Sequence, residues 1–151
     1  MQTKLASLTL AVSLLSSASA LAGSGNAILP LWSANTSTGV SAGTNVYVTN
    51  ITSHTLNIGM TFYAGDGTVT SCPVTVSNLT NSNTQIAAGV TAQISVTCST
   101  LTTGIARIQW SNQSTDIDNV GLVAFGIRYI NYTSAGVSSH TSVPVNGSNP
   151  F

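Results

Sequence analysis

One stretch of the sequence has the spacing of a catalytic nucleophile. Gly39-Val40-Ser41-Ala42-Gly43 matches Gly-x-Ser-x-Gly, and Asp and His residues follow it in the chain order of an α/β-hydrolase triad. That chemistry needs a turn from a strand into a helix, which lifts the serine above a parallel sheet. The flanking residues are rich in Ser, Thr and Gly, and nothing after Gly43 has helical periodicity. We therefore predict a loop that enters the first core strand, no catalytic residue and no enzymatic activity.

Histidines and aspartates are the other side chains with acid–base or metal-binding chemistry. His54 and His140 would each need an orienting carboxylate to act as a base, and a third donor to bind a metal. Asp116 and Asp118 are candidate Ca²⁺ ligands, because hard cations take oxygen ligands. Two carboxylates in a polar loop more commonly cap a turn. We predict no bound metal and no cofactor.

The two cysteines, Cys72 and Cys98, predict a disulfide in an exported protein. In its own expected strand, each cysteine falls at the alternate positions that the apolar residues occupy. Both side chains therefore point inward, where a sandwich could bridge them. No His or further Cys lies at the spacing of a catalytic or metal-binding thiol. The loop of about 25 residues would stabilise the folded state by roughly 3 kcal/mol.

The N-terminus indicates export. Residues 1–22 have a cationic start at Lys4, an apolar run from Leu5 to Leu15 and a small-residue end that fits cleavage after Ala22. The apolar run is about half the roughly 20 residues that span a bilayer. We therefore predict a cleaved signal peptide, a secreted protein that is extracellular, on the cell surface or in the periplasm, and no membrane span after cleavage.

The chain is almost uncharged. Only 4% of its 151 residues are charged, and the formal net charge is zero. A typical soluble domain is about a quarter charged, and so few cations cannot form the basic stripe of a nucleic-acid binder. The 42% hydrophobic content indicates a folded chain rather than a disordered one. Because copies with little net charge do not repel one another, this composition favours self-association.

Apolar and polar residues alternate along the chain after residue 22. Between 55 and 63, Leu56, Ile58 and Phe62 alternate with polar or small residues, and Asp66-Gly67 predicts a hairpin whose return strand contains Cys72. The stretch 120–132 has apolar residues at both odd-numbered and even-numbered positions, which predicts a central strand covered on both faces. Further strands are expected at 45–50, 92–98, 105–110 and 137–145. This pattern predicts one all-β domain over 23–151, an antiparallel β-sandwich.

The Asp66-Gly67 turn after a Phe-Tyr strand, together with Gly89-Val90-Thr91 before an alternating strand, resembles the immunoglobulin-like modules of bacterial secreted and surface proteins. The resemblance covers about 50 residues. It implies an immunoglobulin-like β-sandwich of about seven to eight strands. A fold of this kind does not by itself define a function.

The mature chain is expected to begin with an apolar N-terminal segment and loop over 23–43. Ile28, Leu29, Leu31 and Trp32 must be buried, because an exposed apolar cluster is a liability. They either form the first strand or cover one end of the chain's own sandwich, or they insert into a neighbouring copy by strand addition. Insertion into a neighbouring copy, together with the nearly uncharged composition, predicts an exported structural or adhesive component of a filament or matrix. Its partners would be further copies or other surface proteins.

An alternative function uses the aromatic side chains. Tyr47, Tyr63 and Tyr132 could stack on sugar rings, while neighbouring Asn and Thr residues hydrogen-bond to hydroxyl groups. The protein would then be a monomeric glycan-binding or surface-recognition module. Trp110 shares its parity with Ala106 and Ile108, so it is expected in the core.

Overall fold

The computed structural model describes residues 23–113, 116–132 and 135–151, so the predicted signal peptide lies outside the described residues. Within these ranges the chain forms nine strands and one short 3-10 helix. They are β1 (Ser24–Ala34), β2 (Val40–Asn50), β3 (Leu56–Ala64), β4 (Val74–Ser77), β5 (Gln85–Ile86), β6 (Thr91–Val96), β7 (Thr102–Ser111), β8 (Leu122–Tyr132), β9 (Val137–Pro144) and η1 (Asn146–Ser148). No helix in the described ranges is both long and apolar enough to cross a bilayer.

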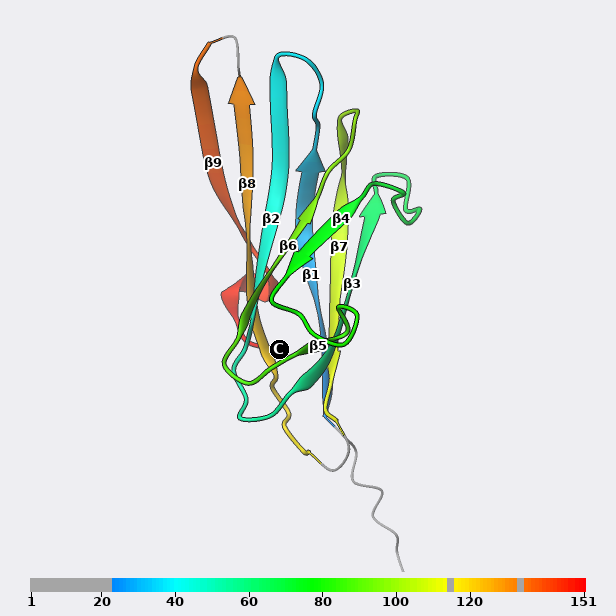
Figure 1. Ribbon diagram of the computed structural model, residues 1–151, viewed down its shortest axis with the longest axis vertical. Coiled ribbons are helices and arrows are strands. Elements are labelled where there is room, and N and C mark those ends of the chain that lie inside the picture. Colours follow the sequence, from blue (N-terminus) through cyan, green and yellow to red (C-terminus); the bar gives the residue numbers. More distant parts are fainter. Residues whose placement is uncertain (1–22, 114–115, 133–134) are drawn as a thin grey trace, which may run out of the picture.

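The strands form two antiparallel sheets that pack face to face (Figure 1). The four-stranded sheet has the order β1-β7-β3-β5, and the five-stranded sheet has the order β4-β6-β2-β8-β9. The prediction of an all-β antiparallel sandwich is confirmed. The strand count exceeds the predicted seven to eight because the two-residue strand β5 is too short to show alternation.

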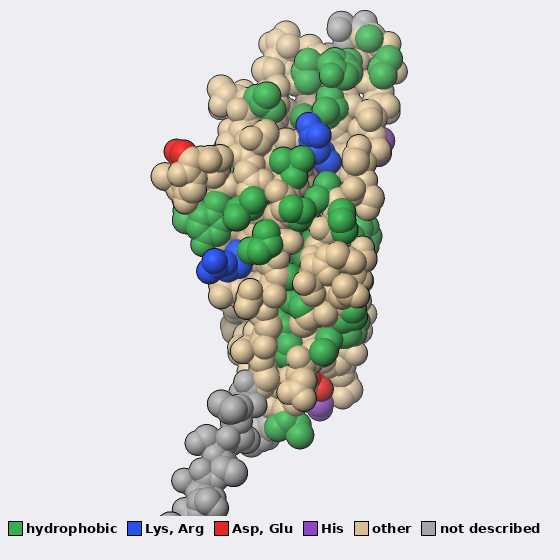
Figure 2. Space-filling view, turned by 180° about the vertical axis from the view of Figure 1, so that it is seen from behind, with side chains coloured by type: hydrophobic (Ala, Val, Ile, Leu, Met, Phe, Trp, Pro, Cys, Tyr) green, Lys and Arg blue, Asp and Glu red, His purple; other side chains and the backbone are tan. Residues whose placement is uncertain are grey.

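The core lies between the sheets and follows the predicted alternation. On β7, Ala106, Ile108 and Trp110 are buried, whereas Arg107 and Gln109 between them are exposed. The core position predicted for Trp110 is therefore confirmed. Large side chains that are completely buried come from both sheets and include Leu29, Trp32, Val46, Val48, Leu56, Ile108 and Leu122. The outer surface consists mainly of uncharged side chains, with few charged groups (Figure 2).

The segment 39–43 is not the loop that the sequence predicts. Strand β2 begins at Val40, and Ser41 pairs with Asn131 of β8. The strand continues through Gly43, which pairs with Tyr129, and an added Cβ at Gly43 would come within 2.3 Å of the Tyr129 Oη. Ser41 therefore lies on a continuous strand and lacks the strand-to-helix turn of a hydrolase nucleophile. The expected N-terminal segment and loop are two strands joined by a short corner.

A turn forms at Asp66 and Gly67, although its central residues are Gly65 and Asp66, because the Gly67 N–H donates to the Ala64 carbonyl at 2.9 Å. Gly67 has a positive φ of 84°, but Asp66 does not, so the turn is not of type I′. A single bridge between Tyr63 and Val69 closes the turn. The chain then crosses to the five-stranded sheet, where β4 pairs with β6 over four residues. The predicted hairpin between β3 and β4 is therefore wrong: β4 forms its backbone ladder with β6 and does not pair with β3.

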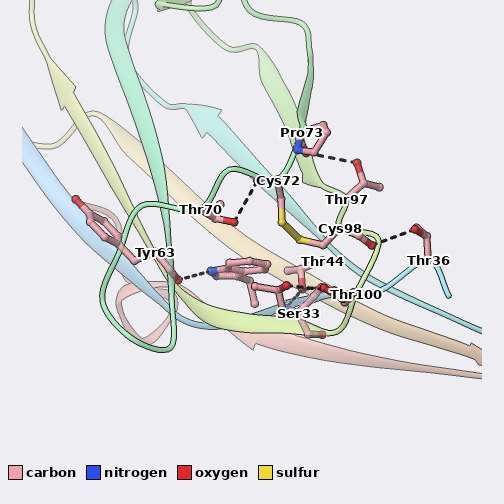
Figure 3. The surroundings of a disulfide bond; sticks show 12 residues. Ser33, Thr36, Thr44, Tyr63, Thr70, Cys72, Pro73, Thr97, Cys98 and Thr100 are labelled. Carbon is pink, nitrogen blue, oxygen red and sulfur yellow. Dashed lines mark hydrogen bonds between the residues drawn. A yellow bond between two sulfur atoms is a disulfide. The ribbon is translucent and has the colours of Figure 1, made fainter.

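The predicted disulfide between Cys72 and Cys98 is confirmed. Cys72 precedes β4 and Cys98 follows β6, so the bond joins the ends of two neighbouring strands in one sheet and does not bridge the two sheets. Beside it, the Oγ1 of Thr97 donates to the Pro73 carbonyl and the Oγ1 of Thr36 donates to the Cys98 carbonyl (Figure 3). The N–H groups of the same two threonines donate to the same carbonyls. The hydrogen bonds of Thr36 thus connect this end of the sheet to the corner between β1 and β2.

Candidate functional site

The apolar N-terminal segment is a strand of the chain's own sandwich. β1 pairs with β7 from Ser24 opposite Ser111 to Ala34 opposite Thr102. The register shifts between Leu29 and Trp32, around Pro30, which has no N–H to donate. The sequence left open whether this segment belongs to the chain's own sandwich or inserts into a neighbouring copy. In the structure it is the first strand of the chain's own sandwich.

The four residues of this segment divide into two pairs. Leu29 and Trp32 are completely buried, and the Trp32 Nε1–H donates to the carbonyls of Tyr63 and Ile105, both at 3.0 Å. Ile28 and Leu31 point outward and are 38% and 40% exposed. Only this second pair is available to a partner.

Next to Ile28 is a pocket on the outer face of the four-stranded sheet. Across the strands, Ile28 lies beside Arg107, and Ile105 lies beside Tyr63. Figure 2 shows this face, where hydrophobic side chains gather beside a cationic one. The pocket is open and has a volume of about 350 Å³. Its lining residues are Tyr63, Ala64, Gly65, Gly67, Gly104, Ile105 and Arg107.

Arg107 is the charged group of this pocket. Within the described residues it forms no ion pair, because the pairs found there are those of His54 with Asp116 and Asp118. The nearby Asp66 carboxylate accepts hydrogen bonds from the N–H and Oγ1 of Thr68, at 2.9 and 2.7 Å. These bonds, with the backbone bond the larger cause, lower the pKa of Asp66.

The three tyrosines predicted as ligand contacts do not meet. Tyr63 lies on the four-stranded sheet, whereas Tyr47 lies on the outer face of the five-stranded sheet, stacked on Phe125 with ring centroids 5.1 Å apart. Tyr132 is at the end of β8 and is 45% exposed. Sequence reasoning missed Phe125, since β8 was expected to be covered on both faces. That expectation is wrong: Phe125 is 43% exposed, because no described element packs over this outer face.

The two candidate Ca²⁺ ligands face a histidine. His54 Nδ1 lies 3.0 Å from the Asp118 Oδ2, and His54 Nε2 lies 3.8 Å from the Asp116 Oδ1. The Ser53 Oγ is 3.4 Å from the same Nε2, at the outer limit of a hydrogen bond. These contacts connect the turn after β2 to the loop after β7. In the described ranges no group of three or more His, Cys, Asp or Glu side chains could hold a metal ion.

Comparison with protein-family models, curated proteins and solved structures finds no match for this chain. The resemblance to immunoglobulin-like modules therefore stays a prediction.

Proposed function

We propose that the protein is an exported, non-catalytic structural component of an extracellular assembly and that it self-associates by strand addition at β9. The observation that carries this proposal is the free edge of the five-stranded sheet. The composition supports it, since the few charges of the chain leave little repulsion between copies.

The four sheet edges differ in how they are protected against pairing with another chain. β5 and β4 are short, at two and four residues. β1 has a bulge and Pro30, which both disfavour the addition of a strand. β9 has eight residues, of which seven are exposed, and it has no Lys, Arg, Asp or Glu and no proline before Pro144. Apart from Pro144 at its last position, it therefore has no bulge, charged side chain or proline of the kind by which natural edge strands avoid pairing.

A second copy of β9 is the simplest partner for this edge. Two β9 strands can pair in antiparallel fashion, so that the free N–H and C=O groups of each satisfy those of the other. Such a contact is self-complementary and has two-fold symmetry. It would continue the five-stranded sheet of one copy into that of the next.

The experiment compares two lysine substitutions on opposite edges of the same sheet. Thr141→Lys places a charge on β9, and Thr75→Lys makes the same change on the short strand β4; both threonines are exposed. Size-exclusion chromatography with light scattering measures the mass of the exported protein over a range of concentrations. We expect Thr141→Lys to shift the protein to smaller species, whereas Thr75→Lys behaves as the wild type. A wild-type protein that is monomeric at every concentration, or equal effects of both variants, would refute the proposal.

One observation favours the alternative, a monomeric module that recognises glycans. The stacked rings of Tyr47 and Phe125 are flanked on the same face by Gln93, which lies opposite Tyr47, and by Asn45. Aromatic faces with neighbouring amides suit neutral sugars. Titration with neutral oligosaccharides tests this function. Phe125→Ala should abolish binding, whereas Tyr63→Ala, on the opposite sheet, should leave it unchanged.

A further inference from the structure

Pairing of two β9 strands closes at a dimer, because a two-fold contact uses the same edge on both copies. An assembly that extends further needs a second contact between two different surfaces. We propose that the pocket at Arg107 binds the Asp116-Ile117-Asp118 loop of a second copy of this chain. This inference rests on the proposed function, since it supplies the contact that lets dimers grow.

The pocket offers one cation within apolar walls. Arg107 has no ion-pair partner among the described residues, and Tyr63 and Ile105 form apolar surface beside it. Gly65 and Gly67 leave the rim open, since an added Cβ would meet no atom within 3.4 Å at either position. The backbone carbonyls of Tyr63 and Ile105 are held from the core side of the sheet by the two hydrogen bonds of Trp32. Tyrosine and arginine in a hollow are the residue types that dominate binding energy at protein interfaces.

The loop offers the complementary chemistry. Ile117 is 70% exposed, the largest value among the exposed large hydrophobic side chains of the described residues. It lies between Asp116 and Asp118, which are two of the three aspartates of the chain. Their side chains keep 27% and 29% exposure beside His54. An isoleucine between two carboxylates fits a pocket with apolar walls and a guanidinium group, which binds carboxylates through charge-assisted hydrogen bonds.

The positions of the two surfaces exclude contact within one molecule. The loop follows the last residue of β7, whereas the pocket lies near its first residues, and from Ile105 to Ser111 the strand spans roughly 20 Å at about 3.3 Å per residue. The loop after β7 lies at the opposite end of the sandwich from the loop after β3, which borders the pocket (Figure 1). The contact is therefore head-to-tail, and such a contact propagates when its rotation does not close a ring.

The test uses the full mature chain in the Thr141→Lys background, where pairing at β9 is blocked. Arg107→Asp removes the cation of the pocket and keeps the loop, whereas Ile117→Asp removes the exposed isoleucine and keeps the pocket. Leu101→Asp is the matched control, because Leu101 is another exposed hydrophobic side chain, at 66%. Sedimentation velocity measures association, and circular dichroism checks that each variant is folded. Arg107→Gln and Ile117→Ser replace any variant that fails to fold.

We expect the background protein to associate, and either pocket or loop variant to weaken association at least about tenfold. Leu101→Asp should have no effect. An equimolar mixture of Arg107→Asp and Ile117→Asp should form one-to-one pairs that do not grow, because only one intact pocket and one intact loop can meet. The inference is overturned if the background protein is monomeric, or if the two variants do not associate when mixed. It is also overturned if Arg107→Asp weakens association and Ile117→Asp does not, which would mean that the pocket takes another carboxylate ligand. Failure of the proposed function is distinct, since it appears as an unchanged mass when Thr141→Lys is introduced into the wild type.

Discussion

Two buried tryptophans differ in what their indole nitrogens meet. Trp32 donates to two carbonyls and stands edge-on to Phe62, with ring centroids 5.6 Å apart. The Nε1 of Trp110 is equally buried but has no hydrogen-bond partner among the described residues. A buried donor without a partner costs free energy, whereas a satisfied one contributes to stability. The two residues therefore form a natural pair for measuring the value of the Trp32 bonds.

We predict that Trp32→Phe lowers the free energy of unfolding by about 1–3 kcal/mol more than Trp110→Phe does. Both changes remove the same ring atoms, but only the first deprives two carbonyls of their donor. Urea unfolding at one low protein concentration measures both, so that association does not contribute. Equal losses in the two variants would mean that the Trp32 hydrogen bonds add nothing beyond packing.

The Asp66 carboxylate gives the fold a dependence on pH. Its pKa is lowered by the hydrogen bonds from Thr68, so the folded state binds the proton less tightly than the unfolded chain. The stabilisation is therefore complete above the unfolded pKa of about 4 and is lost as the pH falls through the folded value. We expect Asp66→Asn to be less stable than the wild type at neutral pH, with a difference that vanishes in acid. Urea midpoints between pH 7 and pH 2 measure it, and a difference that persists at the lowest pH would contradict this assignment.

At the scale of elements, alternation predicted the strands well. The expected stretches 55–63 and 105–110 match β3 and β7 to within three residues, because period-two alternation reports which side chains of one segment face the core. The sequence could not say which sheet a strand joins. Nothing local to the Asp66-Gly67 turn shows that the next strand pairs with β6, and this pairing depends on residues about 20 positions later in the chain.

The same limit applies to the candidate sites. Parity placed Tyr47 on an outer face, but its contact with Phe125 depends on the register between β2 and β8. Likewise, Tyr63 and Arg107 meet at one pocket only because β3 and β7 are neighbours. Exposure of Phe125 was missed because an apolar run on both parities is typical of a covered strand, and what covers a sheet is a property of the whole fold.

The pairing of β3 with β7 gives an element-scale prediction at two glycines. An added Cβ at Gly104 would lie 1.8 Å from the Tyr63 carbonyl oxygen, a backbone atom, whereas at Gly59 it would meet nothing within 4 Å. We expect Gly104→Ala to destabilise the protein by at least about 2 kcal/mol. Gly59→Ala should be neutral or stabilise by up to about 1 kcal/mol, because it restricts the unfolded chain. Thermal and urea unfolding measure both variants, and a tolerated Gly104→Ala would show that the two strands are not held this closely.

At the scale of the whole molecule, the two proposed contacts differ in charge. The edge of β9 has no Asp, Glu, Lys or Arg, so its pairing depends on backbone hydrogen bonds. The contact between pocket and loop joins Arg107 to Asp116 and Asp118 on opposite ends of the sandwich. One contact would join copies side by side and the other end to end. A chain with so few charges thus places opposite signs where successive copies would meet.

This difference predicts that salt separates the two contacts. Raising the ionic strength from 0.1 M to 1 M shortens the Debye length from about 10 Å to about 3 Å, which weakens attraction between partly exposed charges. We expect wild-type assemblies to shorten to β9-paired dimers in 1 M NaCl, and Arg107→Asp to be dimeric already at 0.1 M. The Thr141→Lys variant should change from end-to-end chains at low salt to monomers at high salt. Sedimentation velocity measures all three proteins at matched concentrations, and an equal effect of salt on the wild type and on Arg107→Asp would show that no charged contact extends the assembly.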